Sequence, residues 1–151
     1  MIYVFFDDEH DDLPLAEAIK IAASTTLQLE DQQDTELTIR ISNDEEIQQL
    51  NAQFLGNDKP TDVLSFPSDE FDPDEQSSYI GDIIISYDTA QSQALTSNHP
   101  IEAEIQLLTI HGVLHLLGYD HDTQEAKREM WTKQERILKI LGTQINSITE
   151  K

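Results

Sequence analysis

The chain has 151 residues, and its thirty acidic and nine basic residues give a net charge of −21. This length predicts one domain with its own hydrophobic core, spanning residues 1–151. The chain has no cysteine, which excludes disulfides and thiolate metal ligands. A surface this acidic repels polyanions over most of its area. Because there is no apolar run of membrane-spanning length and no secretory signal pattern at residues 1–10, we expect a cytoplasmic protein without a membrane partner.

Hydrophobic periodicity predicts strands and helices in the order βαβαββααα. The predicted strands are residues 2–6, 36–42, 61–67 and 79–86, and the predicted helices are residues 14–29, 42–56, 88–95, 100–118 and 122–142. The acidic segment 68–78 is expected to be a solvated loop. This order predicts an α+β fold, in which a small mixed four-stranded sheet packs against about five helices.

Turn and cap residues mark the helix ends. Ser42 with Glu45, and Asp122 with Glu125, have the spacing of capping boxes. Gly56 and Gly118 are expected to end their helices in the left-handed conformation.

Three of the five histidines lie in the apolar stretch HGVLHLLGYDH, at His111, His115 and His121. On a helix, His111 and His115 lie on one face, one turn apart. A turn at Gly118 would then bring His121 back toward the same point. Three converging imidazoles are typical of a catalytic zinc site, where a fourth position stays open for water. Nickel, copper and iron also bind imidazole, and a chance set of hydrogen-bonded histidines is the alternative.

The spacing also matches the metzincin protease signature, so the metal helix is expected to be zincin-like. In that signature a glutamate directly follows the first histidine and acts as the general base. Gly112 occupies that position here, which argues against peptide hydrolysis by the same mechanism.

Three blocks of the chain together resemble the YbeY family of bacterial rRNA maturation endoribonucleases. The blocks are HGVLHLLGYDH at residues 111–121, LNAQFLGNDKPTDVLSFP at residues 50–67 and IGDIIISYDTAQSQA at residues 80–94. The resemblance implies an α+β fold and one zinc ion bound by His111, His115 and His121. It also implies cleavage of single-stranded RNA, processing of the 16S rRNA 3′ end and a role in ribosome quality control, with RNA, the ribosome or ribosomal proteins as partners.

The chain departs from the family at Leu55, where members usually carry an arginine thought to take part in RNA binding or catalysis. Leucine removes the most obvious phosphate contact at that position.

Further candidate residues surround the histidines in sequence. We assign His115, Asp120 and Asp62 to catalysis, with Asp120 hydrogen bonding a ligand imidazole, and Ser65 to substrate binding. The alternatives are that Asp120 only stabilises the turn and that Asp62 and Ser65 only make hydrogen bonds at a strand end. His10 and His99 are expected on the surface, and Trp131 in the core.

A basic stripe on the last helix is the predicted contact for rRNA or the ribosome. Six of the nine basic residues follow residue 126, and Arg128, Arg136 and Lys139 fall on one side of an ideal helix. The alternative is an ordinary solvated face.

Two other functions remain open at this point. One is a metal-dependent hydrolase of another substrate class, such as peptides. The other is a ribosome-associated metal-binding protein with little catalytic activity.

Overall fold

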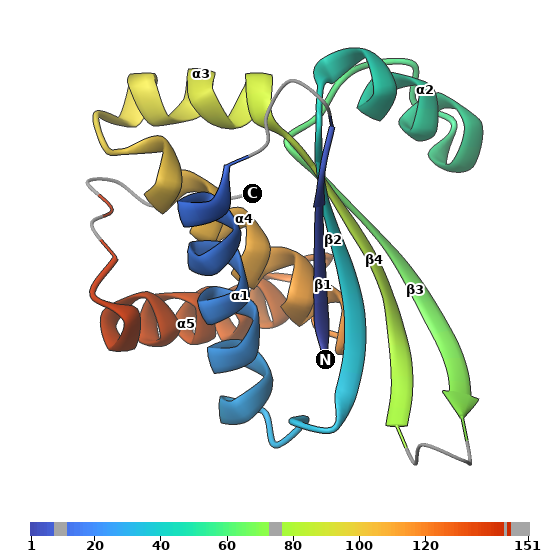
Figure 1. Cartoon of the computed structure of the whole chain (residues 1–151), viewed down its shortest axis with the longest axis vertical. Coiled ribbons are helices and arrows are strands. Elements are labelled where there is room, and N and C mark those ends of the chain that lie inside the picture. The colour runs from blue at the N-terminus through green and yellow to red at the C-terminus, as the bar shows by residue number, and fades with distance from the viewer. Residues whose placement is uncertain (8–11, 73–76, 144, 146–151) are drawn as a thin grey trace.

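The computed structural model describes residues 1–7, 12–72, 77–143 and 145 (Figure 1). Within them the predicted order of elements is confirmed. The strands are β1 (Ile2–Phe6), β2 (Thr35–Ser42), β3 (Val63–Asp72) and β4 (Ser77–Ser86). The helices are α1 (Leu13–Leu29), α2 (Asp44–Leu55), α3 (Tyr87–Ser97), α4 (Ile101–Leu116) and α5 (Gln124–Leu141).

The four strands form one mixed sheet in the order β1-β2-β4-β3. Strands β1, β2 and β4 run parallel, and β3 is the antiparallel edge strand next to β4. Ile39 in the middle of β2 pairs with Val4 on one side and with Ile83 on the other. The predicted fold class, a small mixed sheet with five helices, is confirmed.

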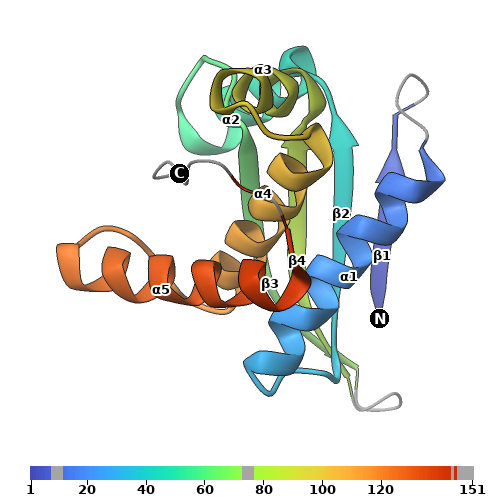
Figure 2. The ribbon, with the colours of Figure 1, turned by 90° about the vertical axis from the view of Figure 1, so that its left-hand side faces the viewer.

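Helices α1, α4 and α5 lie on one side of the sheet, while α2 and α3 lie across the end where β2 and β4 finish (Figures 1 and 2). Helix α4 is buried on nearly all sides, which explains why its sequence is apolar throughout. Ile105, Leu108 and Val113 of α4 belong to the same buried cluster as Ile39 and Ile83 of the sheet. The histidine-bearing helix is therefore part of the core. No helix in the described part of the chain is long and apolar enough to span a membrane.

Helix α4 approaches the sheet closely at Gly112. A Cβ atom added there would lie 2.9 Å from Cγ2 of Ile83, which is closer than side chains tolerate. Gly112 therefore faces β4, and a glutamate in its place would have to displace Ile83. The absence of the metzincin glutamate has a packing reason.

The N-terminal caps of α2 and α5 differ from those predicted, whereas Gly56 ends α2 in the left-handed conformation as predicted. Ser42 is still part of the sheet, where it pairs with Ser86, so Asn43 caps α2 and its side chain accepts the backbone N–H of Glu46. Helix α5 is capped by Thr123 in place of Asp122. Because Ser42 is the last paired residue of β2, the cap of α2 falls on the next residue.

The acidic segment 68–78 is mostly strand. Strand β3 continues to Asp72 and β4 begins at Ser77, because the two pair as an antiparallel hairpin. Residues 73–76 lie outside the described residues.

Two expectations about single residues were wrong. His99 is buried, because its Nε2 atom lies 2.8 Å from Oε1 of the fully buried Glu104. Trp131 is half-buried at a surface pocket of α5 and is not in the core. His10 lies outside the described residues.

Candidate metal centre

Helix α4 and the turn that follows it bring the three predicted histidines together. His111 and His115 lie one turn apart on α4, which ends at Leu116. Gly118 has a φ of 104°, a conformation that favours glycine, and the backbone N–H of Tyr119 then donates to the carbonyl of Leu114. The turn places His121 so that one ring nitrogen from each histidine lies within 4.8 Å of the others. The predicted convergence is confirmed.

The spacing of the nitrogens fits a metal ion. Nε2 of His111 and Nε2 of His115 are 3.1 Å apart. Tetrahedral zinc with bonds of about 2.0–2.1 Å holds its nitrogen ligands about 3.3 Å apart. The His111–His115 pair is close to this spacing, and the His121 nitrogen lies within 4.8 Å of both.

His111 is oriented from behind by Gln134 of α5. Nδ1 of His111 lies 2.6 Å from Oε1 of Gln134, and both side chains are buried. Because the amide oxygen accepts, the ring carries its proton on Nδ1. The lone pair on Nε2 is then directed toward the other two histidines, as in metal sites whose ligands are held by a second residue.

Burial favours the neutral, metal-binding form of His111 and His115. Desolvation, followed by the charge of neighbouring His115, lowers the pKa of His111 from 6.5 to about 4, and the hydrogen bond that His111 donates to Gln134 opposes this only in part. The pKa of His115 is also lowered, first by burial and then by His121.

An open cavity of about 600 Å³ lies in front of the histidines. Its lining joins the histidine turn to the start of β3 and the end of α2. Among the lining residues are His111, His115, His121, Asp120, Asp62, Ser65 and Leu55. The structure therefore brings the predicted ligands, both predicted acids and Ser65 to one place. Leu55 is 54% exposed at the edge of this cavity.

A family model described as Endoribonuclease YbeY matches residues 6–142 of the chain. The chain belongs to the endoribonuclease YbeY family. Endoribonuclease YbeY of Thermoanaerobacter sp. is 38% identical over 147 residues, which cover 89% of this chain and 92% of that protein. Endoribonuclease YbeY of Gloeobacter violaceus is 46% identical over 120 residues, which cover 75% of this chain but only 60% of the longer relative.

A solved structure supports the same assignment. The solution structure of TM1509 from Thermotoga maritima matches with a TM-score of 0.67 and 30% identity, covering 94% of this chain and 90% of the other. The predicted family is thus confirmed, and the predicted enzyme class, a hydrolase of the endoribonuclease type, is confirmed at the level of the YbeY family.

Asp62 and Ser65 tie β3 to its surroundings within this YbeY site. Oδ1 of Asp62 accepts the backbone N–H of Val63 at 2.8 Å, and its Oδ2 lies 3.3 Å from Nε2 of Gln93, a donor on α3. The charge of Asp62 raises the pKa of His111. Ser65 donates to the carbonyl of Gly112 at 3.4 Å. Asp62 thus links the start of β3 to α3, and Ser65 links β3 to α4.

Asp120 stabilises the histidine turn. Its Oδ1 accepts the backbone N–H of His121 at 2.7 Å, and its negative charge raises the pKa of His115. The carboxylate is exposed at the cavity, beside two of the three histidines.

Sequence reasoning missed a second set of residues that hold the turn. The hydroxyl of Tyr119 donates to Oε1 of Glu30, and Nζ of Lys133 donates to Oε2 of the same carboxylate at 3.0 Å. Lys133 also lies 5.1 Å from the centre of the Tyr119 ring. The hydrogen bond with Glu30 is the main reason that the pKa values of Tyr119 and Lys133 are raised. We call Glu30, Tyr119 and Lys133 the turn clamp.

A sequence signal existed for Gln134 but not for the turn clamp. Gln134 interrupts the apolar face of α5 formed by Met130, Ile137 and Leu138, and a single amide in such a face needs a partner. Glu30 is far from Tyr119 in sequence, so no periodicity reveals their contact.

The predicted basic stripe lies apart from this cavity. Arg128, Arg136 and Lys139 are all exposed on α5, as expected, and none of them is among the residues that line the histidine cavity.

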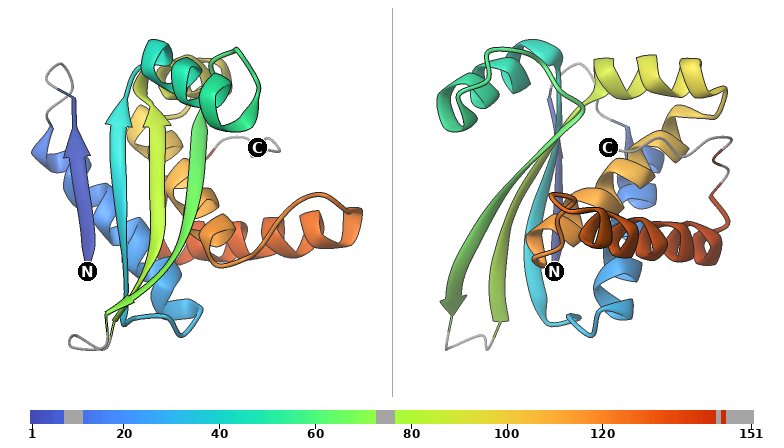
Figure 3. Two further views of the ribbon diagram at one scale, coloured as in Figure 1. Left: turned by 90° about the vertical axis from the view of Figure 1, so that its right-hand side faces the viewer. Right: turned by 180° about the vertical axis from the view of Figure 1, so that it is seen from behind.

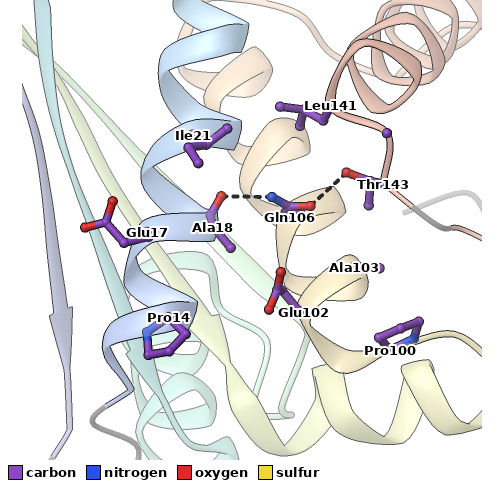
Figure 4. A pocket seen from close by; sticks show the side chains of 11 residues that line it. Pro14, Glu17, Ala18, Ile21, Pro100, Glu102, Ala103, Gln106, Leu141 and Thr143 are labelled. Atoms are coloured by element: carbon purple, nitrogen blue, oxygen red, sulfur yellow. Dashed lines mark hydrogen bonds between the residues drawn. The ribbon is translucent and has the colours of Figure 1, made fainter.

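A second cavity, of about 580 Å³, is lined by residues of α1, α4 and the end of α5 (Figure 4). Nε2 of Gln106 donates to the carbonyl of Ala18, and the Thr143 hydroxyl donates to Oε1 of Gln106. The charged residues in its lining are Glu17 and Glu102, and it contains none of the predicted site residues. We therefore place the chemistry at the histidines.

Proposed function

We propose that this YbeY member is a zinc-dependent endoribonuclease that cleaves single-stranded RNA during maturation of the 16S rRNA 3′ end and ribosome quality control, in the cytoplasm. The observation that carries the proposal is the convergence of three histidine ring nitrogens on an open cavity. Family membership supports RNA as the substrate.

His111, His115 and His121 would hold the ion. Zinc bound by three imidazoles supplies Lewis-acid chemistry, which makes water acidic near neutral pH and stabilises negative charge on phosphate oxygens. Gln134 keeps the proton of His111 on Nδ1 and so leaves Nε2 available. The turn clamp and Asp120 hold the turn that carries His121.

We assign the remaining catalytic tasks to the carboxylates of the cavity. Asp120 is exposed beside His115 and is our candidate for accepting or returning a proton. Asp62 and Ser65 lie at the start of β3, across from the histidines, and would orient the ribose-phosphate backbone. Arg128, Arg136 and Lys139 would attract rRNA or the ribosome from α5.

The packing of Gly112 disfavours a peptidase. The general base of the metzincin mechanism follows the first histidine, and here that position is pressed against Ile83. Peptide hydrolysis would need a different base.

The decisive experiment couples metal analysis to an RNA cleavage assay. The wild type is expected to contain about one zinc per chain and to cleave single-stranded RNA in preference to casein, with activity lost on chelation and restored by zinc. His115→Ala should lose both zinc and cleavage, whereas His10→Ala, which changes a histidine far from residues 111–121 in the sequence, should keep both. Cleavage of casein but not RNA would favour the peptidase, and catalytic silence with ribosome co-sedimentation would favour a binding protein.

A further inference from the structure

A small pocket on the first two turns of α5 combines an aromatic ring with two cations. It has a volume of about 360 Å³ and is lined by Gln124, Lys127, Arg128 and Trp131. These positions are spaced three and four apart, so they share one side of the helix. This half of α5 projects beyond the rest of the molecule (Figures 2 and 3).

We propose that this α5 pocket binds one unpaired nucleotide of the RNA substrate, with its base on the ring of Trp131 and its phosphate on Arg128. The inference rests on the proposed function and adds a binding site to it. Proteins that bind single-stranded nucleic acids combine aromatic rings, on which bases stack, with cations that follow the backbone. Arg128 is exposed and offers a guanidinium that pairs with phosphate, while Trp131 is half-buried.

The distribution of charge favours this location. The chain carries thirty acidic residues, and six of its nine basic residues follow residue 126. RNA therefore meets repulsion over most of the surface, and least on α5. Glu125 and Glu129 are exposed on other sides of the helix, but Glu135 lies four residues after Trp131 on the same side. The favourable region is short, so we infer that it holds a single nucleotide.

The pocket is also near the histidines. Gln124, at the start of α5, is three residues after His121, which limits their Cα separation to about 11 Å. Trp131 lies about two helical turns further, roughly 10 Å along the axis. An RNA strand positioned at the histidines would reach the α5 pocket within a few nucleotides.

Tryptophan fluorescence tests the proposal directly, because Trp131 is the chain's one tryptophan. The zinc-loaded protein would be titrated with a short 2′-O-methyl oligonucleotide, which resists cleavage by attack of the 2′-hydroxyl, while tryptophan fluorescence is recorded. Base stacking should quench and shift the emission. Inorganic polyphosphate and a glutamate-rich peptide carry anions without bases, and neither should quench it. Binding of the oligonucleotide, measured by anisotropy, without a change in emission would overturn the proposal, and so would equal quenching by the peptide.

Variants separate stacking from charge. Trp131→Leu should weaken oligonucleotide binding by about tenfold, and Trp131→Phe, which keeps a flat ring, should restore most of it. Arg128→Gln should lower the slope of log affinity against log salt by about 0.7. Lys20→Gln removes the same charge from an exposed position on α1 and should change neither. If Arg136→Gln weakens binding as much as Arg128→Gln does, the stripe and not the pocket binds RNA.

These readings are independent of catalysis. Quenching without zinc-dependent cleavage would leave the pocket standing and refute the proposed nuclease. If Trp131→Leu, confirmed as folded by circular dichroism, cleaved RNA and bound the oligonucleotide with normal affinity, the pocket would be refuted and the proposed nuclease would stand.

Discussion

Nδ1 of His111 and Oε1 of Gln134 lie 2.6 Å apart, and this contact joins the metal helix α4 to α5 inside the core. The contact assigns α5 two tasks. Its buried face holds a ligand imidazole in one tautomer, while its exposed face carries most of the basic residues. Substitutions on the two faces should therefore have separable effects.

Gln134→Leu should weaken zinc binding without changing the three ligands. The substitution removes the acceptor for Nδ1–H of His111, so the proton is free to move to the nitrogen that faces the ion. Loss of such a partner typically costs tenfold to a hundredfold in metal affinity. Competition with a chromophoric chelator would measure it. Gln106→Leu is the matched control, since this amide is also hydrogen bonded but faces the other cavity; equal losses in both variants would contradict the role of Gln134.

The metal-free protein should lose stability as the pH falls from about 6.5 to about 4. The pKa of His111 is lowered to about 4 by burial, so between these values the unfolded chain binds a proton that the folded chain does not. Stability therefore rises with pH across this window and is lost on acidification. The difference of the two pKa values corresponds to about 3 kcal/mol.

Urea unfolding across that window would measure the effect of His111. Carboxylates titrate in the lower part of the same range, so the comparison must be made against His111→Gln. The variant should show a shallower dependence of stability on pH. Identical curves for the two proteins would show that His111 does not contribute.

Leu55→Arg should strengthen RNA binding or cleavage. The side chain is 54% exposed at the edge of the histidine cavity, where a guanidinium would meet a bound phosphate. We expect RNA affinity or the cleavage rate to rise several-fold at low salt, and we expect this increase to shrink as salt is added. Gln53→Arg adds the same charge two residues away, at an exposed position that is not among the residues lining the cavity, and should have a smaller effect. Equal gains would point to general electrostatics.

Glu30→Ala should loosen the histidine turn. It removes the shared acceptor of Tyr119 and Lys133, so the turn that carries His121 loses its hydrogen bond to the end of α1. We expect weaker zinc binding and faster amide exchange at residues 118–121. Glu36→Ala is the control, because Glu36 accepts a comparable tyrosine hydrogen bond from Tyr3 on the sheet. An unaltered zinc affinity in Glu30→Ala would show that the clamp is not needed.

Much of the fold follows from local patterns. The long apolar run of α4 and the alternation in β2 predict their own elements, and the i, i+4 spacing of His111 and His115 already places both rings on one face. Gly118 predicts the turn that returns His121, because its φ of 104° is a conformation that other residues rarely adopt.

What local patterns could not predict depends on contacts between distant segments. The acidic half of β3 is a strand only because β4 pairs with it. His99 is buried only because its Nε2 atom forms a hydrogen bond with the carboxylate of Glu104 inside the core. The link between Glu30 and Tyr119 likewise arises from the packing of α1 beside the histidine turn.

All three candidate ligands come from one short segment, between His111 and His121. An ion held there closes only a small loop and links none of the strands to one another, so its binding does not set the topology of the sheet. We infer that the metal could leave and return while the rest of the molecule stays folded. Zinc supply would then set the fraction of active molecules without changing the amount of folded protein.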